Sequence, residues 1–227
     1  MSLPPALAQW RKALRASLIE RRLAVAPADH AEWSARIEAL LHSGFPLLER
    51  MTIGLCWPYQ GEFDARSLVR DCRRRGARAA LPAVVAKGAP LEFREWWPGV
   101  AMLTGVFGLP VPDGTAILQP DVLLIPAVGI GARGDRLGFG GGFFDRTLAA
   151  SEPKPICIAL AFELSRVPTT NPQPHDVLMD FVVTEAGIEA AVPGALEAID
   201  ADECTRRTEA LARARGLWRE DAARQIG

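Results

Sequence analysis

The stretch RGDRLGFGGGFFDR (Arg133–Arg146) constrains the fold more than any other part of the chain. It holds five glycines and three phenylalanines, and it comes just after the run DVLLIPAVGI. That run is apolar on both faces, which predicts a buried central strand of a sheet. Because ligands of open α/β sheets bind at the carboxyl ends of the strands, the glycine-rich loop stands where a binding site is expected.

Helices and further strands are expected along the rest of the chain. Leu7, Trp10, Leu14 and Leu18 form one apolar stripe, which predicts a helix over residues 5–23. Other helices are expected over residues 28–43, 64–76 and 142–150, and other strands over residues 52–57, 78–85, 91–96, 155–162 and 180–188. This alternation predicts an α/β fold: a layered, mostly parallel open sheet flanked by helices, of Rossmann-like type.

Two segments are harder to place in a regular sheet. Residues 97–120 are rich in proline and glycine, which favours an irregular connection over one long element. The segment that follows Pro193, beginning ALEAIDADECTRRTEALARARGLWRE, is helix-prone and rich in arginine. We therefore expect an α/β domain over residues 1–193 and a C-terminal helical extension over residues 194–227.

Composition excludes several classes of protein. The formal net charge of the 227 residues is −1, so no overall field favours nucleic acid or anionic lipid. We therefore expect no nucleic-acid partner. No window approaches eighteen apolar residues and no secretion signal begins the sequence, which predicts a cytoplasmic protein with no membrane partner. The oligomeric state is not indicated by the sequence, with a monomer slightly favoured. The four cysteines are widely spread and lack metal-binding spacing, so buried free thiols are expected and a zinc site is not.

The loop itself carries residues that suit anion binding. Gly140–Gly142 at a helix start offers backbone amides to an anion without steric obstruction, and the helix N-terminus adds partial positive charge. Arg136 provides a planar fork for phosphate or carboxylate, and Asp145 lies where it could hold Mg²⁺ on a nucleotide. No lysine follows the glycines as in a Walker A loop, and Phe143 replaces the third glycine of the dinucleotide pattern. The alternative is a glycine turn whose phenylalanines only pack in the core.

The run GDRLGFGGGFFDR resembles the hallmark of the 5-formyltetrahydrofolate cyclo-ligase family. The similarity extends in the same order through RKALRASLIERRLAV, PYQGEFDARSLV, GVFGLPVP, ALAFELSRVP and PHDVLMDFVVTE, over about residues 8 to 190. The resemblance implies ATP- and Mg²⁺-dependent closure of 5-formyltetrahydrofolate to 5,10-methenyltetrahydrofolate, with release of ADP and phosphate. It also implies that phosphorylation of the formyl oxygen drives the reaction.

The resemblance further implies roles for individual residues. Arg136 and Asp145 are expected to be catalytic, with Asp145 as the metal ligand. Helical spacing places Arg11, Arg15 and Arg22 on one face, and the family pattern assigns the first two to ATP phosphates. The residues expected to bind ATP are Arg11, Arg15, Arg136, Gly138, Gly140, Gly141, Gly142 and Phe144, and those expected to bind the folate are Glu62, Phe107 and Phe143. His175 and Asp176 also match the family pattern, without an assigned role.

One position departs from the family pattern. Gly131 stands where family members commonly have an aspartate associated with metal or nucleotide binding, and Asp135 lies nearby as a partial substitute. This departure motivates an alternative function, a regulatory homologue that binds a nucleotide or folate without turnover. A related ligase or kinase that acts on another N-formyl substrate is a third hypothesis.

Overall fold

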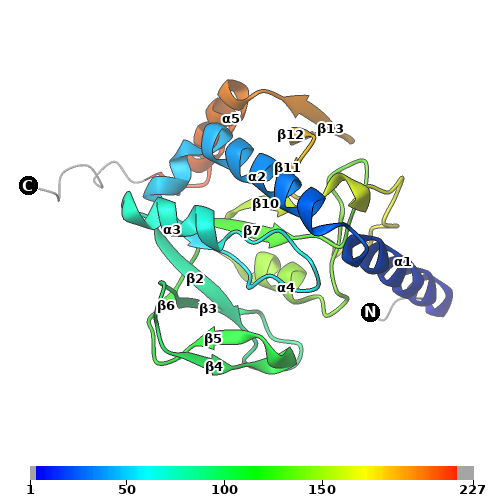
Figure 1. Ribbon diagram of the computed structural model, residues 1–227, viewed down its shortest axis with the longest axis horizontal. Helices are drawn as coiled ribbons and strands as arrows, with labels where there is room; N and C mark the ends of the chain where they lie inside the picture. The colour runs from blue at the N-terminus through cyan, green and yellow to red at the C-terminus, as the bar shows by residue number, and fades with distance from the viewer. Residues whose placement is uncertain (1–3, 219–227) are drawn as a thin grey trace, which may run out of the picture.

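A nine-stranded sheet forms the centre of the protein (Figure 1), whose computed structural model describes residues 4–218. Its five middle strands are parallel, and β7 occupies the central position of the sheet. In spatial order these strands are β11 (Phe181–Thr184), β10 (Ile156–Leu160), β7 (Val122–Pro126), β1 (Thr52–Gly54) and β2 (Arg78–Ala83). The expected parallel α/β sheet and the central place of residues 122–126 are confirmed.

Antiparallel strands complete both sides of the sheet. On one side β12 (Gly187–Val192) and β13 (Ala195–Ile199) follow β11, and on the other β3 (Glu92–Glu95) and β6 (Ile117–Leu118) follow β2. Two small ribbons lie outside this sheet: β4 (Met102–Thr104) with β5 (Pro110–Pro112), and β8 (Gly129–Ile130) with β9 (Arg136–Leu137).

Helices cover both faces of the sheet. One face packs against α2 (Pro27–Gly44), α3 (Arg66–Arg74) and α5 (Ala201–Ala214), and the other against α4 (Phe143–Ala150). Successive side chains of β7 enter these two cores alternately, as the pleat of a strand requires. Helix α1 (Pro5–Leu23) has the expected bounds and packs through Leu18 on Val128 and Leu137, beside the β8–β9 ribbon. Three short 3₁₀ turns, η1 (Pro46–Arg50), η2 (Val106–Gly108) and η3 (Glu163–Ser165), complete the elements.

The prediction of one strand over residues 180–188 is wrong. The chain turns after Thr184 and returns as β12, antiparallel to β11, because Glu185 and Ala186 form a tight turn before Gly187. Both arms of this hairpin carry apolar residues, so the run resembles one long strand. The strand expected over residues 52–57 is also shorter, and its last residues form the loop that leads to the functional site.

The prediction of a helix from Ala195 is wrong as well. Residues Ala195–Ile199 form β13 and pair with β12, so pairing in the sheet overrides their helical propensity. The helix starts at Ala201, where the Asp200 side chain accepts a hydrogen bond from the Glu203 amide at 2.8 Å and caps it. The expected boundary after Pro193 therefore falls inside a hairpin, and α5 shares the core of the sheet through Cys204 and Ala212.

The cysteines agree with the expectation of free thiols. Cys72, Cys157 and Cys204 are buried, Cys56 is partly buried, and none of the four is in a disulfide. Among the described residues, no helix is both long and apolar enough to cross a membrane.

Candidate active site

A cavity of about 710 Å³ opens at the carboxyl ends of the parallel strands. Its floor contains Pro126 at the end of β7, Cys56 just after β1 and Pro82 near the end of β2. The glycine-rich loop between β9 and α4 and the segment that joins β4 to β5 both contribute to its walls. The cavity thus occupies the position predicted for ligands in this class of sheet.

Two arginines of α1 reach the cavity from one side. The Arg11 guanidinium is buried and donates a hydrogen bond to the Asp176 carboxylate at 2.6 Å. The Arg15 Nε donates to the carbonyl oxygen of Gly138 at 2.7 Å, which joins α1 to the glycine-rich loop. Burial, and then the neighbouring charge of Arg11, lower the pKa of Arg15. Two such cations close together in a partly dry site favour an anionic ligand.

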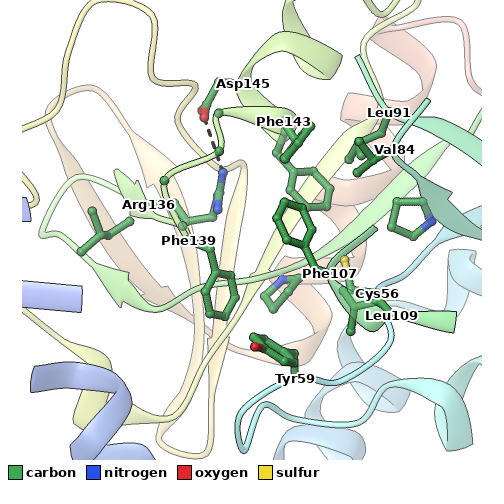
Figure 2. A pocket seen from close by; sticks show the side chains of 18 of the residues that line it. Cys56, Tyr59, Val84, Leu91, Phe107, Leu109, Arg136, Phe139, Phe143 and Asp145 are labelled. Atoms are coloured by element: carbon green, nitrogen blue, oxygen red, sulfur yellow. Dashed lines mark ion pairs between the residues drawn. The ribbon is translucent and has the colours of Figure 1, made fainter. Parts of the chain in front are cut away.

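Arg136 and Asp145 face each other across the glycine-rich loop (Figure 2). The Arg136 Nη2 lies 3.8 Å from Oδ2 of Asp145, whose Oδ1 accepts a hydrogen bond from the Val177 amide at 3.3 Å. The guanidinium also lies 5.4 Å from the ring centre of Phe144, within cation–π range. The Nε atoms of Arg11 and Arg136 are buried, and neither has a hydrogen-bond partner among the described residues. Unpaired buried donors of this kind are costly unless a ligand accepts from them.

The glycines of the loop bring backbone and arginines close together. A Cβ atom at Gly138 would stand 2.4 Å from Nη1 of Arg136, so only glycine leaves the guanidinium in place. Gly140 has a φ of 95°, and a Cβ there would stand 3.1 Å from the Arg15 guanidinium carbon. Gly142 is the left-handed N-cap of α4, with a φ of 62°. These conformations favour glycine.

Four aromatic rings also line the cavity (Figure 2). The rings of Phe107 and Phe143 meet edge to face with centres 6.1 Å apart, and those of Tyr59 and Phe139 do so at 5.5 Å. Phe107 is 68% exposed and has a positive φ of 64°, an unusual conformation for a bulky residue. Its side chain therefore keeps much of its ring free to stack against a flat ligand.

Glu62 places a buried carboxylate in the cavity wall. The Tyr59 amide donates to its Oε2 at 3.0 Å, whereas Oε1 has no hydrogen-bond partner among the described residues. Burial raises the pKa of Glu62 to about 7, although Arg22, the Tyr59 amide and Arg136 each act to lower it. Near neutral pH this carboxyl group can therefore either donate or accept a proton.

The raised pKa of Glu62 predicts a pH-dependent stability. The pKa of an unfolded glutamate is near 4.5, so between pH 4.5 and about 7 the unfolded state releases its proton while the folded state keeps it. The free energy of unfolding therefore falls as the pH rises through this range, and above pH 7 it no longer changes through this group. From pH 5 to 8 the wild type should lose up to about 3 kcal/mol of unfolding free energy through this group. We expect Glu62→Gln to abolish that loss in urea unfolding, and Glu32→Gln, an exposed control, to retain it. Parallel pH curves for all three proteins would contradict the prediction.

All twelve residues proposed from the sequence line this cavity. They are Arg11, Arg15, Glu62, Phe107, Arg136, Gly138, Gly140, Gly141, Gly142, Phe143, Phe144 and Asp145. Arg22 shares the helix face of Arg11 but does not line the cavity, because eleven residues of helix separate them by about 16 Å. Sequence reasoning missed Tyr59, Phe139 and the pairing of Arg11 with Asp176, which is 165 residues away in the chain. No local pattern signals such a distant pair.

The structure also explains the departure at Gly131. A Cβ atom at this position would stand 2.2 Å from Oδ2 of Asp135, so the Asp135 carboxylate fills the space that a side chain at position 131 would need. That carboxylate is buried and accepts hydrogen bonds from the amide and hydroxyl of Thr170, at 3.1 and 2.5 Å. Asp135 does not line the cavity, so it holds two loops together and does not substitute for a ligand-binding aspartate.

Comparison with known proteins decides the family. A model of the 5-formyltetrahydrofolate cyclo-ligase family matches residues 7–185. The chain belongs to this family. A Mycolicibacterium smegmatis protein named 5-formyltetrahydrofolate cyclo-ligase is 32% identical over 183 residues, covering 75% of this chain and 91% of that relative. An Escherichia coli K12 cyclo-ligase of the same name is 29% identical over 135 residues, covering 57% of this chain and 74% of the relative.

Solved structures of two synthetases share the cyclo-ligase fold. The 5,10-methenyltetrahydrofolate synthetase of Aquifex aeolicus superposes with a TM-score of 0.69 at 22% identity, over 78% of this chain and 91% of its own. The synthetase of Mycoplasma pneumoniae gives a TM-score of 0.65, also at 22% identity, over 77% of this chain and 98% of its own. These likenesses confirm the expected cyclo-ligase architecture.

Proposed function

We propose that this protein is an ATP-dependent ligase that converts 5-formyltetrahydrofolate to 5,10-methenyltetrahydrofolate and releases ADP and phosphate. The presence of cationic and aromatic side chains in one cavity carries this proposal. Its cationic residues Arg11, Arg15 and Arg136 lie together with the N-terminus of α4, whose first amides lack partners within a helix, a combination suited to a triphosphate. Its aromatic residues Phe107 and Phe143 suit a flat heterocycle such as the pterin.

The chemistry explains why both ligands must meet in one cavity. The formyl oxygen is a poor leaving group, so N10 of the folate cannot close the ring by displacing it directly. Transfer of the γ-phosphoryl group to that oxygen forms a P–O bond and releases ADP. N10 then attacks the formyl carbon and loses its proton, and the original oxygen departs as part of phosphate. The protein contributes positioning and charge stabilisation, which dominate phosphoryl-transfer catalysis.

Individual residues have defined parts in this scheme. Arg136 lies in β9, directly before the glycine-rich loop, and stabilises charge that develops on the transferred phosphoryl group. Arg11 and Arg15 hold the phosphates from the α1 side, and Phe144 supports the Arg136 guanidinium. Glu62 has a free carboxylate oxygen in the wall, where it accepts a hydrogen bond from the folate.

The donor set also fits a magnesium ion carried by the nucleotide. Mg²⁺ usually needs only one or two protein carboxylates when substrate phosphates supply other ligands. Asp145 provides one, since its Oδ2 faces the cavity at 3.8 Å from Arg136 without a close hydrogen bond. Asp176 is engaged by Arg11 and by the Gln173 amide, so Asp145 is the ligand we propose. When bound, the ion would neutralise charge on the phosphates.

One assay tests the function against its alternatives. Purified protein is incubated with 5-formyltetrahydrofolate, ATP and Mg²⁺, while the near-ultraviolet absorbance of the methenyl product and the release of ADP are followed. We expect equal amounts of product and ADP, and loss of both when EDTA is added. Ligand binding without product would favour the non-catalytic regulatory homologue. ADP release with only another N-formyl compound would favour the related ligase.

We further propose that residues 194–227 are an addition to a family domain that covers residues 1–193. The match to the family model ends at residue 185, which supports this division. The added segment contributes β13 and α5 to the same sheet and core, so it extends the domain and does not form a separate one. A cytoplasmic location and a monomeric state stay predictions.

A further inference from the structure

Arg22 is a buried arginine that connects three parts of the chain behind the cavity wall. Its Nε donates to the carbonyl oxygen of Gln60 at 2.9 Å, and its Nη1 donates to that of Ala127 at 3.3 Å. Ala127 directly follows β7, and Gln60 belongs to the turn Tyr59–Glu62 after β1. One side chain from the last turn of α1 therefore fixes two loops at the carboxyl edge of the sheet.

The turn that Arg22 contacts is strained and has to be held in place. Gln60 has a φ of 49°, in the left-handed region that costs a non-glycine residue about 1 kcal/mol or more. Arg22 is only 4% exposed, so water does not compete for the hydrogen bonds that its guanidinium donates to the two loops. The turn ends at Glu62, so its conformation decides where the Glu62 carboxylate points.

The same guanidinium also faces the Glu62 carboxylate without forming a hydrogen bond to it. Its Nη2 lies 3.8 Å from Oε1, and neither atom has a hydrogen-bond partner among the described residues. A buried ion pair left at this distance repays little of its desolvation cost, so stability alone is a poor explanation for it. The arrangement instead favours the ionised form of Glu62 against the effect of burial, and it leaves Oε1 free to accept a hydrogen bond from a ligand.

We propose that Arg22 is a positioning residue, which holds the Tyr59–Glu62 turn and aims the Glu62 carboxylate into the cavity for hydrogen bonding to the substrate. The proposal rests on the proposed function for the identity of that substrate. The contacts of Arg22 with the turn and the carboxylate are independent of it.

Other groups also face Glu62 and enter the design of a test. Arg136 of β9 lowers the pKa of Glu62, as Arg22 does, and the Cys56 thiol after β1 shares the same buried region. On the far side of the turn, a His30 ring nitrogen lies 3.1 Å from the Gly61 carbonyl oxygen. Because these groups are unchanged in an Arg22 variant, a change in Glu62 titration reports on Arg22 alone.

The first measurement reads Glu62 directly. Glutamate is labelled with ¹³C at the side-chain carboxyl, the Glu62 signal is assigned by its loss in Glu62→Gln, and its titration is followed. We expect Arg22→Met to raise the pKa of Glu62 by about one unit or more, because an opposing charge has been removed. Arg21→Met is the matched control: Arg21 is the preceding residue of α1 and is exposed. An Arg22→Met titration identical to that of Arg21→Met would overturn the proposal.

The second measurement uses turnover and separates charge from geometry. In Arg22→Met the acid limb of the kcat/KM profile should move up in pH together with the Glu62 titration. In Arg22→Lys the charge remains but the fork does not, so we expect KM for the folate to rise about tenfold with the titration nearly unmoved. A KM in Arg22→Lys equal to that of the wild type would overturn the positioning role. If Arg22→Met does not fold, the result for Arg22→Lys alone tests the proposal. A wild type without turnover would refute the proposed function, while the NMR titration would still test Arg22.

Discussion

Arg136→Ala is expected to lower kcat/KM for ATP-dependent ring closure by about a thousandfold, the size of effect found when a preorganised charge donor is removed. The stability cost should be small, because this guanidinium has a buried Nε without a partner and reaches Asp145 only at 3.8 Å. The loss is therefore specific to charge stabilisation of the transferred phosphoryl group.

The measurement for Arg136 combines steady-state kinetics with thermal unfolding. Arg133→Ala is the matched control, since Arg133 lies three residues earlier, in the turn between β8 and β9, and is exposed. We expect the control to keep near-wild-type kcat/KM and both variants to melt within a few degrees of the wild type. A loss of activity in Arg136→Ala that is matched by a large drop in melting temperature would assign Arg136 a structural role instead.

Gly138→Ala is expected to lower kcat/KM by about a hundredfold through the same arginine. The added methyl group would stand 2.4 Å from Nη1 of Arg136 and so displace the guanidinium, and a shift of about 1 Å in a catalytic group can cost this much. The Gly138 carbonyl oxygen remains available to Arg15. The colliding atom is the far end of a flexible side chain, so the fold should tolerate the change.

A double-mutant cycle tests that explanation. If Gly138→Ala acts by moving Arg136, it should cost little further activity in a protein that already carries Arg136→Ala. Two losses that multiply would show that Gly138 serves the site in another way, such as by shaping the backbone for the phosphates. Kinetics of the wild type, both single variants and the double variant at one pH supply the four values required.

Much of the fold could be predicted from the sequence because its strongest patterns are local. The two-sided apolar run 122–126 marked the central strand, and the stripe through Leu18 marked α1 with correct bounds. The prediction failed where tertiary pairing outweighed local preference, as at residues 195–199, whose helical propensity yields to pairing with β12. The Asp200 cap that starts α5 was a readable local signal.

The candidate site divides in the same way. The glycine-rich loop could be found from its composition, and the family resemblance added Glu62 and Phe107, which indeed line the cavity with it. Contacts between residues far apart in the sequence could not be predicted, because only the folded chain brings Arg11 and Arg22 to their partners. Helical spacing grouped these two arginines, yet one enters the cavity and the other lies behind its wall.

The attachment of α1 has a consequence for ligand binding. Only three residues of this helix are buried, and two of them, Arg11 and Arg22, are cations held by polar contacts. Leu18, with the partly buried Leu14 and Ile19, supplies the apolar anchor. Helices with few buried apolar contacts open locally more easily than the core of a protein, so we expect α1 to be less protected from hydrogen exchange than the central strands. An anion that engages Arg11 and Arg15 fastens the helix as it binds. If the nucleotide binds as proposed, its affinity is therefore linked to the stability with which α1 is attached.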